Sequence, residues 1–106
     1  MKKRIAIIGS GIAGLTLAGL LQTNSNLEFA VYEKEEVLNL DEGFGIQLSV
    51  NSVLILNKIG FNQLNKIEKY HPSKLDFYSI NSNKICDLDL TTFNSTNNKY
   101  TTLRRS

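Results

Sequence analysis

Residues 4–33 read R-I-A-I-I-G-S-G-I-A-G-L-T-L-A-G-L-L-Q-T-N-S-N-L-E-F-A-V-Y-E, and this stretch decides the fold. The apolar, β-branched run at residues 4–8 is typical of a strand buried on both faces of a parallel sheet. Residues 12–21 are rich in Leu, Ala and small side chains, which predicts a helix packed closely on that sheet. A polar loop leads to a second strand at residues 27–32. Strand, helix and strand within about 30 residues make a βαβ unit.

The turn between the first predicted strand and the helix has the spacing G-x-G-x-x-G, formed by Gly9, Ser10, Gly11, Ile12, Ala13 and Gly14. The motif has the context that it requires, because it follows a strand and opens a helix. In such a turn the first glycine permits the tight bend, the second lets a diphosphate approach the backbone, and the third lets the helix pack near the strand. The helix N-terminus then offers unpaired N–H groups to the diphosphate. We therefore predict that these six residues bind a cofactor.

Glu33 ends the second predicted strand and follows Gly14 at nearly the ~20-residue spacing of an acid that hydrogen-bonds a ribose. The plainer alternatives are a glycine-rich turn without a ligand and a solvated glutamate at a strand end. The two signals support each other, since one fold would place both beside the same nucleotide. NAD and FAD fit these features equally, so the residues alone predict a site for an adenine dinucleotide.

Beyond this unit the pattern predicts shorter elements. They are a strand at 46–48, a helix at 51–59 with Gly60 just after it, a short second helix at 61–67, a β-hairpin of strands 75–80 and 84–90, a polar loop at 91–98 and a strand at 99–103. The expected fold class is α/β, with the N-terminal βαβ unit of a Rossmann-like fold, an added helix and hairpin, and an incomplete parallel sheet.

Composition excludes several classes of function. The chain has 106 residues, of which 42% are hydrophobic and 21% charged, as expected of one soluble globular domain or part of one. A net charge of +2 with scattered lysines does not indicate a nucleic-acid partner. Cys86 stands alone, which excludes an internal disulfide and gives no metal site, and His71 is expected to be an ordinary surface residue.

The first 27 residues also imitate a secretory signal peptide, with Lys2-Lys3-Arg4 before an uncharged run. Patterned glycines interrupt that run, which argues against this alternative. The apolar residues left after the strand are too few for a transmembrane helix. We expect a cytoplasmic protein.

Four stretches, I-A-I-I-G-S-G-I-A-G-L-T-L-A-G-L-L (5–21), V-Y-E-K (31–34), G-F-G-I-Q-L-S-V-N-S-V-L-I-L-N-K-I-G-F (43–61) and T-L-R-R-S (102–106), carry a family resemblance. In this order and approximate spacing they resemble the FAD-dependent aromatic hydroxylases. This group of flavoprotein monooxygenases includes salicylate hydroxylase-like, p-hydroxybenzoate hydroxylase-like and ubiquinone-pathway enzymes. The G-x-G-I-x-L-x-x-N segment is more specific than the glycine motif, and it favours FAD over NAD.

The resemblance implies roles for further residues. Glu33 and Lys34 are similar to the residues beside the adenosine ribose, although the family usually has arginine at the position of Lys34. Gly45 and Gln47 lie where the family's chain passes near the flavin. Arg105 resembles an arginine that reaches the FAD diphosphate, a contact that suits a guanidinium. No basic residue occurs at 35–42, where relatives often have an FAD-contacting arginine, and Val50 stands where proline is usual. No catalytic residue is identified.

The resemblance also implies a reaction in which NAD(P)H reduces bound FAD and an aromatic small molecule is then hydroxylated. The family's later Asp-Gly and Gly-Asp motifs and its substrate-binding sheet do not occur in these 106 residues. We therefore expect residues 1–106 to be the N-terminal part of a single FAD-binding domain, inactive alone, with a possible partner polypeptide supplying the remainder. The alternatives are a small NAD(P)-binding Rossmann module, a segment of another flavoprotein type and a non-enzymatic remnant.

Overall fold

The computed structural model of the chain describes residues 1–37, 43–65 and 68–104. The chain divides into two compact units, Met1–Leu40 and Asp41–Ser106, and each is described by itself. Among the residues described, no helix is long and apolar enough to cross a lipid bilayer.

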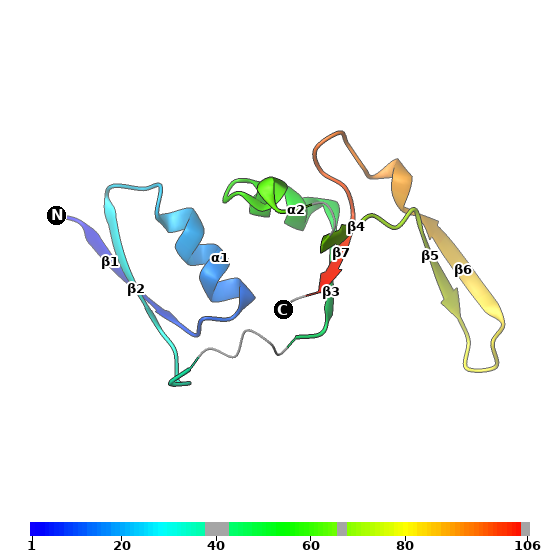
Figure 1. Cartoon of the computed structure of the whole chain (residues 1–106), viewed down its shortest axis with the longest axis horizontal. Helices are drawn as coiled ribbons and strands as arrows, with labels where there is room; N and C mark the ends of the chain where they lie inside the picture. Colours follow the sequence, from blue (N-terminus) through cyan, green and yellow to red (C-terminus); the bar gives the residue numbers. More distant parts are fainter. Residues whose placement is uncertain (38–42, 66–67, 105–106) are drawn as a thin grey trace. The chain divides into compact units, whose positions relative to one another are not determined.

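The first unit is a βαβ unit of β1 (Lys3–Ile8), α1 (Ile12–Leu21) and β2 (Leu27–Tyr32), as Figure 1 shows. β1 and β2 are parallel neighbours, in register from Lys3 opposite Leu27 to Ile8 opposite Tyr32. α1 contacts both strands, and Ala18 on the helix and Ile7 on β1 are buried. The predicted Rossmann-like start of the chain is confirmed, with helix and strand bounds within one residue of those expected.

β1 is less covered than the sequence predicts. Ile7 is 6% exposed, whereas its neighbour Ile8 is 81% exposed. Successive side chains of a strand point to opposite faces, so only one face of β1 is covered. In the part of the chain that the structure describes, β1 pairs with β2 alone. The expectation of burial on both faces is therefore wrong for this structure.

The second unit contains a small antiparallel sheet and a hairpin. Its elements are β3 (Gly45–Leu48), α2 (Val50–Asn57), the 3-10 helix η1 (Phe61–Gln63), β4 (Lys69–Tyr70), β5 (Lys74–Tyr78), β6 (Lys84–Asp89), the 3-10 helix η3 (Leu90–Thr92) and β7 (Thr101–Arg104). The three-stranded sheet has the order β3-β7-β4, and the hairpin pairs β5 with β6. The predicted strand, helix, hairpin and final strand are confirmed.

Three features of this unit differ from the expectations. A short 3-10 helix stands where a second helix is predicted at 61–67, of which residues 66–67 lie outside the described part of the chain. β4 and the 3-10 helix η3 are not predicted. The three-stranded sheet is antiparallel, so the parallel pairing that the sequence predicts is confined to β1 and β2 among the described strands.

Thr101 at the start of β7 anchors the core of the second unit, where Val53 and Leu90 are also buried. The Thr101 side chain is 1% exposed. Its hydroxyl donates to the Lys99 carbonyl oxygen at 2.8 Å and lies 3.1 Å from His71 Nδ1. A buried hydroxyl is tolerated here because both of its hydrogen-bonding functions have partners.

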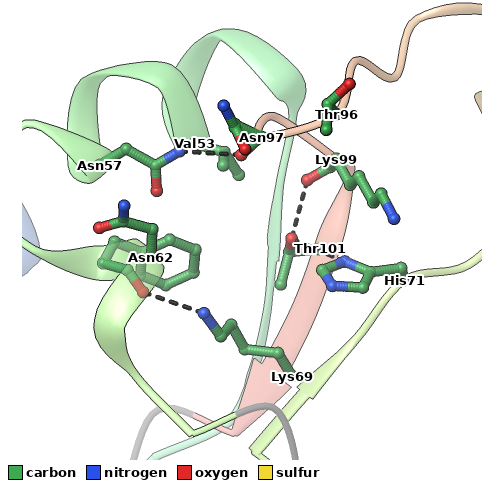
Figure 2. Close-up of a pocket in the computed structure, with 10 residues that line it drawn as sticks. Val53, Asn57, Asn62, Lys69, His71, Thr96, Asn97, Lys99 and Thr101 are labelled. Atoms are coloured by element: carbon green, nitrogen blue, oxygen red, sulfur yellow. Dashed lines mark hydrogen bonds between the residues drawn. The ribbon is translucent and has the colours of Figure 1, made fainter.

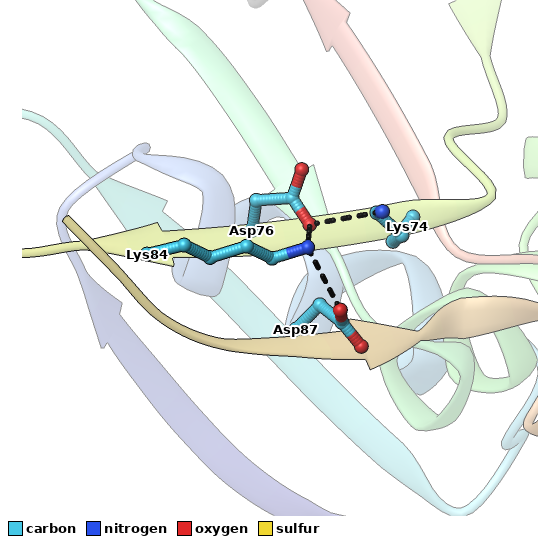
Figure 3. Close-up of polar contacts among 4 residues, drawn as sticks. All are labelled: Lys74, Asp76, Lys84 and Asp87. Atoms are coloured by element: carbon cyan, nitrogen blue, oxygen red, sulfur yellow. Dashed lines mark ion pairs between the residues drawn. The ribbon is translucent and has the colours of Figure 1, made fainter. Parts of the chain in front are cut away.

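An exposed ion-pair network joins β5 and β6 (Figure 3). Lys84 Nζ lies 2.8 Å from Asp87 Oδ2 and 3.2 Å from Asp76 Oδ1, and Lys74 Nζ lies 3.3 Å from the same Asp76 oxygen. The hydrogen bonds to Asp87 and Asp76 raise the pKa of Lys84 above its ordinary value. Because water screens these charges, the network orients the side chains more than it stabilises the hairpin.

We expect Thr101→Val to lower the free energy of unfolding by about 1–3 kcal/mol, because the change removes a buried hydroxyl and leaves its partners unsatisfied. Thr101→Ser is the matched control: it keeps the hydroxyl, and its smaller loss is about 1 kcal/mol for one methyl group. Urea denaturation of the 106-residue chain measures both. Equal losses in the two variants would show that the hydrogen bonds are unimportant.

Candidate dinucleotide-binding site

The turn after β1 depends on two glycines. Gly9 has φ +99°, in the left-handed region that favours glycine, and its N–H donates to the Tyr32 carbonyl oxygen at 2.7 Å. Gly14 lies in the first turn of α1, and a Cβ placed on it would stand 2.0 Å from the Gly9 carbonyl oxygen. The first glycine thus permits the bend and the third permits the close approach of helix and turn.

The second glycine of the motif has a different environment. A Cβ on Gly11 would meet no protein atom within 4 Å. Gly11 is also the N-cap of α1, where no side chain caps the helix and the first turn carries no acidic residue. The opening N–H groups of a helix have no intrahelical partner, so this end of α1 offers donors and a positive dipole to an anion.

Glu33 follows β2, and its carboxylate lies against the glycine turn. Glu33 Oε2 accepts hydrogen bonds from the Ser10 backbone N–H at 2.8 Å and from the Ser10 hydroxyl at 2.7 Å. Glu33 Oε1 accepts from the Glu35 N–H at 3.2 Å. Hydrogen bonds lower the pKa of Glu33 to about 2. The bond from the Ser10 N–H has the largest effect, followed by those from the Ser10 hydroxyl and the Glu35 N–H. The carboxylate is therefore ionised at neutral pH and lies beside the motif.

The remaining predicted site residues are distributed over the chain. Lys34 is exposed directly after Glu33, in the first unit. Gly45 and Gln47 lie on β3 in the second unit, where Gln47 Oε1 accepts a hydrogen bond from the Tyr100 hydroxyl at 2.9 Å. Arg105 lies outside the described residues. Of the predicted site residues, the structure brings Glu33 together with Ser10 in the glycine turn.

Sequence reasoning placed Ser10 in the motif but missed its contact with Glu33. The contact follows from the register of β1 and β2, which the structure supplies. Ile8 and Tyr32 are partners at the carboxyl ends of two parallel strands, so the residues that follow each strand meet at one edge. A hydroxyl two residues after the first strand can then reach an acid one residue after the second.

The second unit contains a separate cavity of about 280 Å³ beside α2, η1, β4 and β7 (Figure 2). Asn57 Nδ2 donates to the Asn97 carbonyl oxygen and to Asn98 Oδ1, both at 3.0 Å, so the amide orientation is fixed. Asn57 Oδ1 is buried, and no donor from the described residues reaches it. Lys69 Nζ donates to the Phe61 carbonyl oxygen at 3.0 Å and lies 4.8 Å from the Phe61 ring centroid.

His71 lines the same cavity and is exposed, as predicted, but its ring is held in one orientation. The Thr101 hydroxyl gives its single hydrogen to the Lys99 carbonyl oxygen, so it accepts at His71 Nδ1. The Tyr100 carbonyl oxygen, 3.2 Å from Nδ1, can also only accept. The proton of a neutral His71 is therefore on Nδ1. No group of three potential metal ligands occurs among the described residues.

We expect Gly14→Ala to destabilise the chain by about 1–3 kcal/mol, because its new methyl group would overlap the Gly9 carbonyl and force α1 away from the turn. Gly11→Ala is the matched control: its methyl group meets open space, and the cost at an N-cap is below about 1 kcal/mol. Thermal unfolding followed by circular dichroism compares them. A Gly14→Ala variant as stable as the natural chain would contradict the close packing seen here.

The sequence comparisons agree with the fold of the first unit. The sequence pattern of the NAD(P)-binding Rossmann-like domain family matches residues 7–40. The chain is 49% identical over 59 residues to the 3-amino-4-hydroxybenzoate 2-monooxygenase PtnB3 of Streptomyces platensis, and 48% identical over 59 residues to PtmB3 of the same organism. It is 44% identical over 57 residues to the 3-amino-4-hydroxybenzoate 2-monooxygenase of Streptomyces cremeus.

These matches cover 56%, 56% and 54% of this chain but only 14% of each relative's length. They therefore concern one part of this chain and a small part of each relative. Monooxygenases are oxidoreductases. The predicted resemblance to an enzyme family is therefore confirmed over the 57–59 matched residues. In its matched part the chain is thus similar to an NAD(P)-binding Rossmann-like domain and to aromatic monooxygenases.

Proposed function

We propose that the first unit binds the ADP part of FAD and that the chain contributes this site to a flavoprotein aromatic monooxygenase. The observation that carries the proposal is the position of the Glu33 carboxylate, within 2.8 Å of Ser10 in the glycine turn that opens α1. An adenosine diphosphate needs both an acceptor for ribose hydroxyls and donors for the diphosphate. In this unit the Glu33 acceptor and the N–H donors at the start of α1 lie at the same turn.

Each group has a separate task in the proposed site. The Gly11 backbone and the opening N–H groups of α1 donate to diphosphate oxygens, and the open space at Gly11 leaves room for that approach. The ionised Glu33 carboxylate accepts from the ribose, a charge-assisted hydrogen bond. When bound, the flavin supplies the redox chemistry, while the protein supplies position and orientation.

The identity of the dinucleotide is part of the proposal. The Rossmann-like match alone would suit NAD(P), and the small NAD(P)-binding module remains the second candidate on that observation. The resemblance to the FAD-dependent aromatic hydroxylases favours a flavin cofactor, with NAD(P)H as its reductant, and the three relatives are named as monooxygenases. Lys34, Gly45, Gln47 and Arg105 are proposed as further FAD contacts on the family resemblance.

The substrate class follows from the relatives' names. All three are named for an aminohydroxybenzoate, which supports an aromatic small molecule as the substrate here. The matched part is 14% of each relative, so we propose that the residues that bind the substrate are supplied outside these 106 residues, for example by a partner polypeptide. A cytoplasmic location, where NAD(P)H is available, belongs to the same proposal.

We expect Glu33→Ala to weaken FAD binding by roughly 10- to 100-fold, because a charge-assisted hydrogen bond contributes about 1.5–3 kcal/mol. Titration of the 106-residue chain with FAD, followed by flavin fluorescence, measures the change. Glu36→Ala is the matched control, since it removes the same charge three residues away. A titration with NADH, followed by the fluorescence of NADH itself, separates the two candidates: preferential binding of NADH would favour the NAD(P) module. Equal FAD affinity in all three proteins would remove Glu33 from the site.

We also expect the 106-residue polypeptide, supplied with FAD and NADPH, to show no phenol-dependent oxygen uptake. The reason is that the matched residues correspond to only 14% of each monooxygenase relative, which we propose to be the part that binds the dinucleotide. An oxygen electrode with a panel of phenols and aminohydroxybenzoates makes the measurement, with buffer containing FAD and NADPH alone as the blank. Hydroxylated product formed by the purified chain would overturn this part of the proposal.

A further inference from the structure

The Glu33 carboxylate has most of its acceptor positions occupied. An ionised carboxylate offers about four acceptor positions, two on each oxygen. Both positions on Oε2 are taken by Ser10, through its N–H at 2.8 Å and its hydroxyl at 2.7 Å. On Oε1 one position is taken by the Glu35 N–H at 3.2 Å. The Lys34 N–H makes the smallest contribution to lowering the Glu33 pKa. Among the hydrogen bonds from Ser10 and Glu35, the open position is on Oε1.

We propose that Ser10 is a positioning residue that holds Oε2 of Glu33 against the glycine turn, so that Oε1 alone accepts a hydroxyl of the bound ribose. This inference rests on the proposed function and deepens it. It implies that only one of the two ribose hydroxyls donates a hydrogen bond to Glu33. It also assigns a role to the Ser10 side chain, beyond the backbone role of its place in the motif.

The hydroxyl contributes something that the backbone N–H alone does not. An exposed glutamate at a strand end has several rotamers, and binding a ligand through one of them costs conformational entropy. Two donors that converge on the same oxygen fix both its position and the rotation of the carboxylate. Because Ser10 already orders the Glu33 side chain, binding of the ribose loses less conformational entropy. This preorganisation increases the affinity.

Charged side chains do not account for this orientation. The glycine turn and α1 contain no titratable residue, and β1 carries only Lys3 and Arg4. Arg4 Nε lies 3.3 Å from Glu28 Oε2. The charged neighbours on the segment of Glu33 itself are Lys34, Glu35 and Glu36. The causes that lower the Glu33 pKa are all hydrogen bonds, led by the Ser10 N–H and then the Ser10 hydroxyl.

The experiment compares ADP binding to the 106-residue chain with Ser10→Ala, Ser10→Thr and a control, Ser25→Ala, which removes a hydroxyl in the loop before β2. We expect Ser10→Ala to weaken ADP by roughly 3- to 10-fold at pH 7, the value of one ordinary hydrogen bond. Ser10→Thr keeps a hydroxyl and restores most of the affinity, and Ser25→Ala leaves it unchanged. Isothermal titration calorimetry gives all four affinities.

The pH dependence separates positioning from a structural effect. The pKa of Glu33 is lowered, so its charge is present above the ordinary value of 4.5 and is lost only as the pH falls towards about 2. At pH 7 both the natural chain and Ser10→Ala are ionised, and a difference in affinity there reflects orientation. As the pH falls through 4.5, Ser10→Ala should lose ADP first, because its Glu33 pKa is higher. Carbon-13 NMR of the Glu33 carboxyl measures that pKa without nucleotide.

The two deoxy forms of ADP test the single hydroxyl. If Oε1 alone accepts, either 2′-deoxy-ADP or 3′-deoxy-ADP binds less tightly and the other binds like ADP. Similar losses for both would overturn the inference, and so would tighter binding of ADP to Ser10→Ala, which would make the Ser10 hydroxyl a competitor of the ribose. ADP affinity unchanged in Ser10→Ala would overturn it while leaving the proposed function intact. A natural chain that binds neither ADP nor FAD would overturn both.

Discussion

The first unit depends on one close contact, between the start of α1 and the backbone of the turn after β1. At Gly14 there is no room for even a methyl group, since a Cβ would stand 2.0 Å from the Gly9 carbonyl oxygen. This contact fixes where the helix begins, and so where its unpaired N–H groups lie. The Gly9 N–H, bonded to the Tyr32 carbonyl oxygen, ties the same turn to the end of β2. Glu33 comes next in the chain, so one packing constraint places donors and acceptor together.

The electrostatics of this site come from the backbone and one carboxylate. α1 has no charged side chain, so the field at its N-terminus comes from the peptide dipoles. The negative charge of Glu33 is stabilised by hydrogen bonds from Ser10 and Glu35. The second unit differs because its interior contains polar atoms, from Thr101 and Asn57. Thr101 is fully paired, whereas Asn57 Oδ1 is buried and accepts no hydrogen bond from the described residues.

The parts that could be predicted from the sequence are those with strong local signals. The βαβ unit has an uninterrupted apolar run, a patterned glycine turn and an alternating second strand, and each of these acts over a few residues. β4 has only Lys69 and Tyr70, whose strand conformation comes from pairing with Leu103 and Thr102 far along the chain. No local pattern reports such a partner. The burial of β1 was misjudged for a related reason: an apolar run shows that a strand can be covered, and not what covers it.

The candidate site divides in the same way. The glycines and Glu33 were identifiable because their spacing follows from the geometry of the fold. The Ser10–Glu33 contact depends on the register of two strands, which the sequence does not state. Gln47 was predicted from family resemblance alone, and its described partner, the Tyr100 hydroxyl, lies 53 residues away in the sequence.

The one-sided pairing of β1 has a consequence for hydrogen exchange. In a parallel pair, alternate amides of a strand point towards the neighbour and the others point away. With β2 as the only partner of β1 among the described strands, half of the β1 amides have no ladder acceptor. Protection from solvent deuterium along β1 would then alternate from residue to residue. Uniform slow exchange would instead record a further strand on its open edge, so the exchange pattern of this one strand reports how far the sheet extends in solution.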